Sequence, residues 1–224
     1  MQIQAHEVRF NAGGVYVDAD VTIPVSASAM VLFVHGSGSS RHSPRNQFVA
    51  SHLQAQGLGT VLMDLMTPDE ERADQFTGHL RFDIGFLARR VVAVLGDVRE
   101  LAPVPIGLFG ASTGAAAALV VAATPSARIS AVVSRGGRPD LAGTALTSVQ
   151  VPTLLIVGGE DREVLALNEK AMERMKTEVR LEVVPGASHL FHEPGALETV
   201  AHLAADWFTS HIADNRPSPT SDRR

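Results

Sequence analysis

The sequence contains no cysteine and only two lysines among its 224 residues. The absence of cysteine excludes disulfide bonds, thiolate-bound zinc and a cysteine nucleophile. The longest apolar run, residues 115–123, is far shorter than a membrane-spanning helix requires. The first ten residues, MQIQAHEVRF, have no basic segment followed by an apolar one, so we expect no secretory leader and a cytoplasmic location.

Positive charge is also scarce, because 19 lysines and arginines stand against 24 aspartates and glutamates. The resulting net charge of −5 argues against nucleic acid or an anionic membrane as a partner. The expected partner is a small-molecule substrate, with no cofactor, no metal ion, no nucleic acid and no membrane. The sequence leaves the oligomeric state open.

Length and composition favour one globular domain. A chain of 224 residues, 45% of them hydrophobic and 19% charged, can bury one substantial core. We expect this domain to span residues 1–213. The remaining residues, 214–224 (DNRPSPTSDRR), are polar and proline-rich, so we expect them to be disordered.

The hydrophobic pattern predicts strands of two kinds. Segments 3–10 and 15–23 alternate between apolar and polar residues and flank the turn sequence NAGG, which predicts an antiparallel hairpin. Six short apolar runs follow, of the kind found in strands buried on both faces of a parallel sheet. These runs are 29–35, 59–65, 104–110, 129–134, 152–159 and 179–186.

Helical stretches lie between and after these runs, at about 44–56, 83–101, 113–123, 163–176 and 195–212. Alternating strands and helices predict right-handed crossovers with helices on both faces of the sheet. The expected fold is therefore α/β, with about eight mostly parallel strands, an N-terminal antiparallel hairpin and no large cap domain. Ligands of such sheets bind beyond the carboxyl ends of the strands, so polar residues at those ends are the candidates for a site.

Ser112 lies in the sequence GASTG (110–114), between a predicted strand and a predicted helix. A nucleophile elbow requires this strand–turn–helix context, with glycines two residues on either side of the serine to avoid clashes. The N-terminus of the helix adds positive potential where an oxyanion would form. The alternative is that small residues merely pack a turn against the sheet, because G-x-S-x-G arises easily by chance in a chain with 19 glycines.

A serine nucleophile needs a base and an orienting carboxylate, expected in the chain order serine, acid, histidine. Asp161 follows a predicted strand 49 residues after Ser112, and His189 follows the last predicted strand 28 residues later. Glu160 and His192 are the competing residues. We favour Asp161 because it is the shorter and better-ordered acid. We favour His189 because His192 lies beside the start of the last helix.

A glycine-rich loop, HGSG at 35–38, follows another predicted strand. It lacks the G-x-x-x-x-G-K-[ST] pattern of a phosphate-binding loop, so its position favours an oxyanion hole. The expected donors are the backbone N–H groups of Ser37 and Thr113. We expect His35 to hold the loop by hydrogen bonds rather than to act as a base.

Four arginines follow predicted strand ends: Arg41, Arg45, Arg135 and Arg138. Planar guanidinium groups suit carboxylates, so one hypothesis is that these residues bind an anionic ester or lactone. The alternative is that they pair within the chain, for example Arg138 with Asp140 or Asp64, or that they anchor loop carbonyls.

These segments resemble α/β-hydrolases, and specifically the dienelactone hydrolase family. They are most similar to small bacterial members that also occur fused to phosphoribosyltransferase domains. The resemblance spans roughly residues 5–210 and rests on HGSGSSRHSPRN, GLFGASTGAAAAL, VSRGGRPDLAG, PTLLIVGGEDREV and VPGASHLFHEPGAL. It implies Ser112 as nucleophile, Asp161 as acid, His189 as base, and Ser37 and Thr113 as oxyanion residues. The founding members use a cysteine nucleophile, which this chain lacks, so dienelactone itself is not the expected substrate.

The sequence thus predicts a serine hydrolase that cleaves small carboxylic esters or lactones through an acyl-enzyme. Its site is expected to be open or covered by loops such as 66–80 (MTPDEERADQFTGHL). Two alternatives stay open. In the first alternative, the same triad hydrolyses an amide, a thioester or a carbon–carbon bond. In the second, the chain is a non-catalytic binding protein on the same fold.

Overall fold

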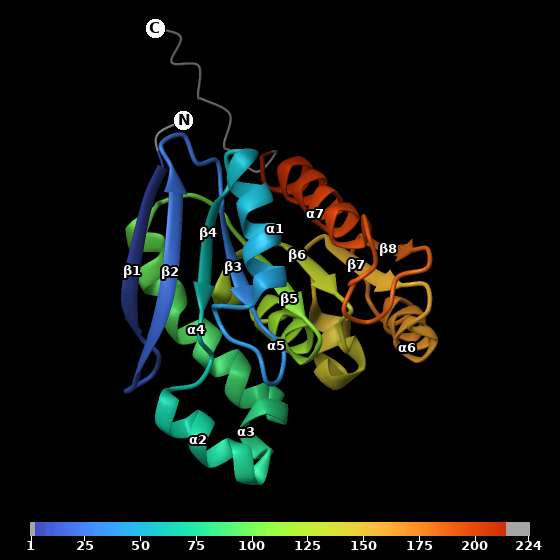
Figure 1. Ribbon diagram of the computed structural model, residues 1–224, viewed down its shortest axis with the longest axis horizontal. Helices are drawn as coiled ribbons and strands as arrows, with labels where there is room; N and C mark the ends of the chain where they lie inside the picture. Colours follow the sequence, from blue (N-terminus) through green and yellow to red (C-terminus); the bar gives the residue numbers. More distant parts are fainter. Residues whose placement is uncertain (1–2, 214–224) are drawn as a thin grey trace, which may run out of the picture.

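The structure, a computed structural model, describes residues 3–213. Eight strands form one sheet in the order β1-β2-β4-β3-β5-β6-β7-β8 (Figure 1). Their bounds are β1 Ile3–Asn11, β2 Tyr16–Pro24, β3 Met30–Val34, β4 Gly59–Met63, β5 Ile106–Ala111, β6 Ile129–Arg135, β7 Thr153–Gly158 and β8 Val179–Val184. The tail that was predicted to be disordered, 214–224, lies outside the described residues.

The pairing of the strands follows the hydrophobic pattern. β1 pairs antiparallel with β2, and β2 pairs antiparallel with β4, whereas the remaining neighbours are parallel. Every residue of β3, β4, β5 and β7 is buried, which explains why these strands appear in the sequence as continuous apolar runs. The predicted α/β fold with an N-terminal hairpin is confirmed.

Helices cover both faces of the sheet (Figure 1). Residues of α1 and α7 pack on the face that carries Phe33 and Phe109, whereas residues of α4, α5 and α6 pack on the face that carries Leu32 and Leu108. Successive side chains of a strand point to opposite faces, which produces this division. No helix in residues 3–213 is long and apolar enough to cross a membrane. The helices are α1 Pro44–Ala55, α2 Pro68–Thr77, α3 His79–Phe82, α4 Ile84–Leu101, α5 Thr113–Ala122, α6 Arg162–Met172 and α7 Ala196–Ala213, with the 3₁₀ helices η1 Pro125–Ala127 and η2 Pro139–Ser148.

The segment 66–80, which we expected to be a loop, is largely helical and contains α2. The Thr67 hydroxyl accepts the Glu70 N–H at 3.2 Å, and the Thr67 N–H donates to Glu70 Oε2 at 2.8 Å. This capping box, with Pro68 in the first turn, is the sequence signal that the loop prediction overlooked. The buried carboxylate of Asp74 accepts a backbone N–H of α3 at 2.7 Å and fixes the turn between the two helices.

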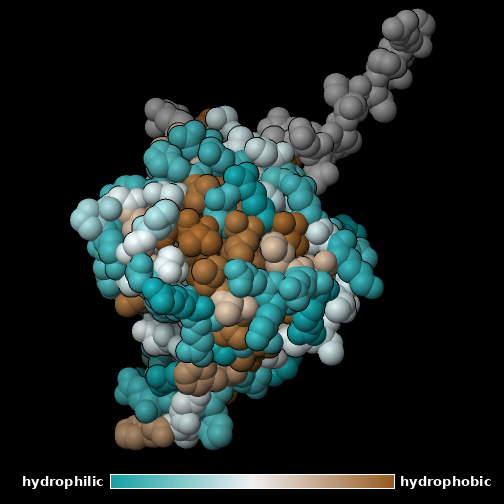
Figure 2. Space-filling view, turned by 90° about the vertical axis from the view of Figure 1, so that its right-hand side faces the viewer, coloured by the Kyte–Doolittle hydropathy of each residue, from teal (hydrophilic) through white to brown (hydrophobic). Residues whose placement is uncertain are grey.

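Strand β8 lies at one edge of the sheet, beyond β7. Figure 2 shows this side of the molecule, where apolar side chains gather in a central patch surrounded by polar ones. Val183 of β8 is 42% exposed. The sequence predicts a strand buried on both faces here, but β8 is an edge strand, and only Val184 of its six residues is buried.

Candidate active site

Ser112 lies at the sharp turn between β5 and α5. Its backbone has φ 51° and ψ −121°, and only two other non-glycine residues in the described part of the chain have a positive φ. A residue with a side chain is strained in this region and stays there only where the surrounding packing enforces it. A strained serine between a buried strand and a helix N-terminus has the geometry of a nucleophile elbow.

Gly110 and Gly114 allow the elbow to pack against its neighbours. A Cβ added to Gly114 would lie 2.1 Å from the Val34 carbonyl oxygen, and one added to Gly110 would lie 2.4 Å from the Cα of Ala115. Both distances are well below van der Waals contact, so a side chain does not fit at either position. Residues 115–118 are fully buried behind the turn. The GASTG segment is therefore both a strained turn and a tightly packed run of small residues.

The Gly114→Ala variant is expected to lose about 3 kcal/mol of unfolding free energy, because the new methyl group meets rigid backbone. Gly96 provides a matched control, since it is exposed within α4 and a Cβ there would meet nothing within 4 Å. Gly96→Ala is expected to gain about 0.5–1 kcal/mol from its higher helix propensity. Urea unfolding of both variants measures the difference, and equal stabilities contradict the packing argument.

Asp161 and His189 lie against each other at the ends of β7 and β8. Asp161 occupies the N-cap position of α6, and His189 lies in the loop 185–195. The His189 Nδ1 atom is 2.6 Å from Asp161 Oδ2. When the carboxylate accepts the Nδ1 proton, Nε2 is left as the acceptor that a general base needs. Among the described residues, neither the Glu160 carboxylate nor the His192 ring is hydrogen-bonded to this pair.

Two hydrogen bonds hold the loop 185–195 in place, at the residues just before His189. The Glu160 N–H donates to the Ala187 carbonyl oxygen at 3.0 Å, which ties the loop to the end of β7. The Ser188 N–H donates to Glu193 Oε2 at 3.0 Å. Hydrogen bonding to the Ser188 side chain, together with this backbone bond, favours the ionised carboxylate and lowers the pKa of Glu193. The backbone that carries the histidine is therefore fixed by the residues on either side of it.

The end of β6 connects the surroundings of Ser112 with those of His189. The Ser112 N–H donates to the Arg135 carbonyl oxygen at 3.2 Å. A Cβ added to the next residue, Gly136, would lie 3.5 Å from Nδ1 of His189. Ser112 and His189 therefore both adjoin the end of β6, and Asp161 contacts the His189 ring. Ser112 Oγ makes no hydrogen bond to His189 within residues 3–213, and such bonds are often loose until a substrate is bound.

The glycine-rich loop 35–38 is tied to the elbow by Thr113. The Ser37 N–H donates to Thr113 Oγ1 at 2.9 Å, and Thr113 is buried at the first position of α5. The sequence predicts both residues as backbone donors to an oxyanion, but it does not reveal this bond, because the bond depends on the Thr113 rotamer. An oxyanion that binds the Ser37 N–H would share that proton with the threonine hydroxyl or displace the hydroxyl.

His35 lies buried beneath the same loop and uses both ring nitrogens. Its Nε2 accepts the Leu65 N–H at 3.1 Å, and its Nδ1 lies 2.9 Å from the Gly36 carbonyl oxygen, to which it donates. Burial lowers the pKa of His35, so the ring is neutral at neutral pH. His35 therefore holds the loop in place, as the sequence predicts.

Acidification is expected to destabilise the protein in part through His35. Its folded-state pKa is depressed, so the unfolded chain takes up a proton first as the pH falls below about 6.5. The stability that the neutral ring contributes is present above that pH and is lost as the pH falls toward the folded-state pKa. Between pH 7.5 and pH 5.5, the melting temperature should drop less in His35→Gln than in the wild type. The exposed His42→Gln control should drop as much as the wild type, and an equal drop in all three proteins contradicts the assignment.

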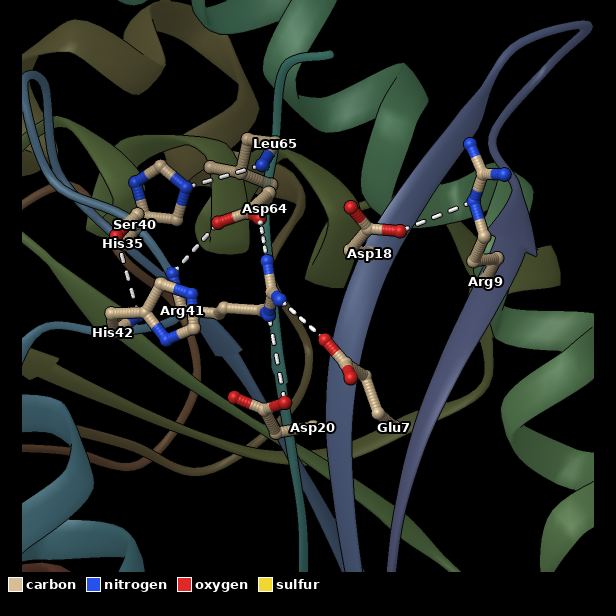
Figure 3. Close-up of polar contacts among 10 residues, drawn as sticks. All are labelled: Glu7, Arg9, Asp18, Asp20, His35, Ser40, Arg41, His42, Asp64 and Leu65. Atoms are coloured by element: carbon tan, nitrogen blue, oxygen red, sulfur yellow. Dashed lines mark hydrogen bonds and ion pairs between the residues drawn. The ribbon is translucent and has the colours of Figure 1, made fainter. Parts of the chain in front are cut away.

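Carboxylates of the chain hold two of the four candidate arginines. Arg41 donates to Asp64 Oδ2 and to Glu7 Oε1, each at 2.7 Å (Figure 3). Arg138 makes two 2.8 Å hydrogen bonds to the carboxylate of Asp140. For these two arginines the structure shows the pairing alternative, because their guanidinium groups are occupied within the chain.

Arg45 and Arg135 differ from that pair. Neither makes a hydrogen bond or an ion pair through its side chain with any residue in 3–213, and Arg45 Nε and Arg135 Nη1 are buried without a partner. Arg135 is the last residue of β6, and Arg45 lies in the first turn of α1. For these two arginines the described residues do not show the pairing alternative.

A hollow of about 390 Å³ lies beside the glycine-rich loop. It is lined by Gly38, Ser39, Ser40, Met66, Glu71, Gln75 and Arg81. Met66 and Arg81 also line a small cavity of about 10 Å³ that reaches Gly36 and Ser37. The segment that contains α2 and α3 therefore forms a wall of the space next to the expected oxyanion loop. Residues 3–213 contain no group of three or more acidic or histidine side chains placed to hold a metal ion.

Two curated sequences from Mycobacterium tuberculosis, each named a putative phosphoribosyl transferase, are 52% identical to this chain over 219 residues. The match covers 96% of this chain but 48% of each relative, so the chain spans about half the length of these relatives.

The chain is also similar to solved structures and to a family model. A dienelactone hydrolase from Anabaena variabilis is 52% identical, with a TM-score of 0.92 over 95% of this chain and 100% of that one. Est1E from Butyrivibrio proteoclasticus, at 16% identity, shares the fold with a TM-score of 0.77 over 92% of this chain and 99% of that one. Residues 63–211, about two thirds of the chain, match the model of the dienelactone hydrolase family. The chain belongs to the dienelactone hydrolase family, whose α/β-hydrolase fold it shares.

Proposed function

We propose that this protein is a serine hydrolase that cleaves small carboxylic esters or lactones, with Ser112 as nucleophile, His189 as base and Asp161 as the orienting acid. The observation that carries the proposal is the 2.6 Å contact between His189 Nδ1 and Asp161 Oδ2 beside a serine held at φ 51°. Membership of a hydrolase family, and a neighbour in fold that is described as a cold-adapted esterase, support the same reaction class.

The first half of the reaction forms an acyl-enzyme. Ser112 Oγ attacks the carbonyl carbon of the substrate while His189 Nε2 removes its proton. The negative charge that develops on the carbonyl oxygen is stabilised by the backbone N–H groups of Thr113 and Ser37. The bond to the leaving alcohol then breaks, and His189 returns the proton to the leaving oxygen. Asp161 stabilises the imidazolium while the proton resides on the ring.

The second half releases the acid and restores the enzyme. His189 removes a proton from a water molecule, whose oxygen attacks the acyl carbon. The second tetrahedral intermediate uses the same N–H donors and collapses with breakage of the bond to Ser112 Oγ. His189 donates the proton to that oxygen, which leaves a carboxylic acid and the free serine.

A small acyl group fits this site best. Within the described residues, the longest insertion near the strand ends is the segment that contains α2 and α3, and no separate cap covers the sheet edge. The hollow of about 390 Å³ beside the expected oxyanion loop has Met66 as its one large apolar side chain, so a long acyl chain would find no extended apolar wall there. The further preference for anionic esters or lactones would rest on Arg45 and Arg135, since Arg41 and Arg138 already bind carboxylates.

A substrate panel tests this function. We expect turnover of p-nitrophenyl acetate and of a small lactone, with kcat/KM falling at least about tenfold toward the octanoate ester because a long chain finds no apolar cap. Thioester and anilide analogues of the same acyl group test the alternative bonds, and faster cleavage of either favours that alternative. A folded protein that cleaves none of them is a binding protein on a hydrolase fold.

A further inference from the structure

Arg135 is a buried cation without a counter-ion in the described part of the chain. Its side chain lies at the carboxyl end of β6, the residue as a whole is 7% exposed, and Nη1 is fully buried with no hydrogen-bond partner. Burying a charge is strongly unfavourable unless a partner compensates it. The partner of Arg135 is therefore expected to come from outside residues 3–213.

Arg90, a second buried arginine, shows that the fold can supply acceptors to a buried guanidinium group. Arg90 is also 7% exposed, but it donates to the Glu70 carboxylate and, at 2.8 Å, to the Ala12 carbonyl oxygen. Burial alone thus does not leave an arginine unsatisfied in this protein. Arg135 is distinct because its groups have no such acceptors.

The charged group that acts on Arg135 is another cation, Arg45. Burial first, and the positive charge of Arg45 second, lower the pKa of Arg135 to about 10. Arg135 still carries its charge at neutral pH. The two positive groups therefore repel each other, and no acidic side chain in residues 3–213 forms an ion pair with Arg135.

Strand register places this pair beside the elbow. Arg135 is two residues from Val133, which packs on the α1 and α7 face of the sheet, so both side chains point to that face. Arg135 is aligned with Ala111, the residue before Ser112. Arg45 lies in the first turn of α1, which covers the same face, and the N-terminus of that helix adds positive potential. Arg45 is partly exposed, so the pair is reached from solvent on its side.

We propose that Arg135 and Arg45 form a binding site for the phosphate group of a small molecule. Two guanidinium groups and a helix N-terminus balance a dianion, whereas one carboxylate would leave a net positive charge in a buried place. The phosphate belongs either to the ester substrate or to a separate small anion. The first is possible because Arg135 is aligned with Ala111, the residue before Ser112. The first source rests on the proposed hydrolase function, and the binding itself does not.

The binding experiment uses the Ser112→Ala protein, so that it is independent of catalysis. Inorganic phosphate should raise the melting temperature above that in sodium chloride of equal ionic strength, and acetate should bind at least tenfold more weakly. Arg135→Gln in the same background should weaken phosphate binding at least tenfold. This variant should fold, because it removes an uncompensated buried charge. The Arg90→Gln control should lose stability but keep the phosphate response.

A kinetic experiment distinguishes the two sources. We compare p-nitrophenyl propanoate with the matching 3-phosphonopropanoate ester in the wild type and in Arg45→Gln and Arg135→Gln. A substrate phosphate predicts at least tenfold higher kcat/KM for the phosphonate ester, lost in Arg135→Gln, and competitive inhibition by inorganic phosphate. Phosphate binding without discrimination between the esters indicates a separate anion. The proposal is overturned if phosphate stabilises the protein no more than chloride, or if Arg135→Gln keeps the full phosphate response.

Discussion

Replacing Ser112 with alanine is expected to lower kcat for p-nitrophenyl acetate by about 10⁶-fold, the scale seen when the serine of a triad is removed. The loss is large because no acyl-enzyme forms without the attacking oxygen, and His189 and Asp161 act only through that oxygen. Stability should change little, since alanine and serine meet the same constraint at φ 51°. Steady-state kinetics and thermal unfolding of the same preparation separate the two effects.

Ser134 is the matched control for this experiment. It is fully buried on β6, next to the elbow strand, and its hydroxyl has no hydrogen-bond partner in the described residues. Ser134→Ala should therefore keep activity within about twofold, since no hydrogen bond is lost. A Ser112→Ala protein that retains more than about one per cent of wild-type activity would place the nucleophile elsewhere.

The Asp161→Asn variant is expected to lower kcat by about 10⁴-fold with little change in KM. The carboxylate accepts the Nδ1 proton of His189 at 2.6 Å, which leaves Nε2 free to receive the serine proton. An asparagine amide presents an N–H to Nδ1, so the ring proton moves to Nε2 and the base is lost.

Glu160, next to Asp161, tests whether activity depends on the carboxylate that contacts His189 or on any negative charge at this place. Its contribution to the site is a backbone N–H that donates to the Ala187 carbonyl oxygen, which a side-chain substitution leaves in place. Glu160→Gln should therefore keep kcat within about threefold of the wild type. If Glu160→Gln and Asp161→Asn lose the same activity, Asp161 is not the orienting acid.

The sheet could be predicted from sequence because its physical signal is local. Strands such as β5 and β7 are buried on both faces and hence appear as unbroken apolar runs. The candidate triad could be predicted from the same pattern, since parallel strands bring their carboxyl ends to one edge. The helix α2 also had a local signal, the Thr67–Glu70 capping box, which the prediction overlooked.

The partners of the arginines and of the oxyanion loop could not be predicted, because they depend on side-chain directions that the hydrophobic pattern does not determine. All four candidate arginines follow strand ends, and nothing in their spacing separates Arg41, which meets Asp64, from Arg135, which meets no acid in the described residues. The bond between the Ser37 N–H and Thr113 Oγ1 joins residues 76 positions apart and depends on one rotamer. Such contacts follow from how the loops pack and become visible only in the folded chain.

The most direct test of the central claim is to locate a covalent adduct. The wild-type protein is treated with a fluorophosphonate, and the modified peptide is identified by mass spectrometry. We predict one phosphonyl group per chain on the Ser112 hydroxyl, with no modification in Ser112→Ala and slow modification in Asp161→Asn. An adduct on another residue, or continued labelling of Ser112→Ala, would contradict the assignment of Ser112 as the nucleophile.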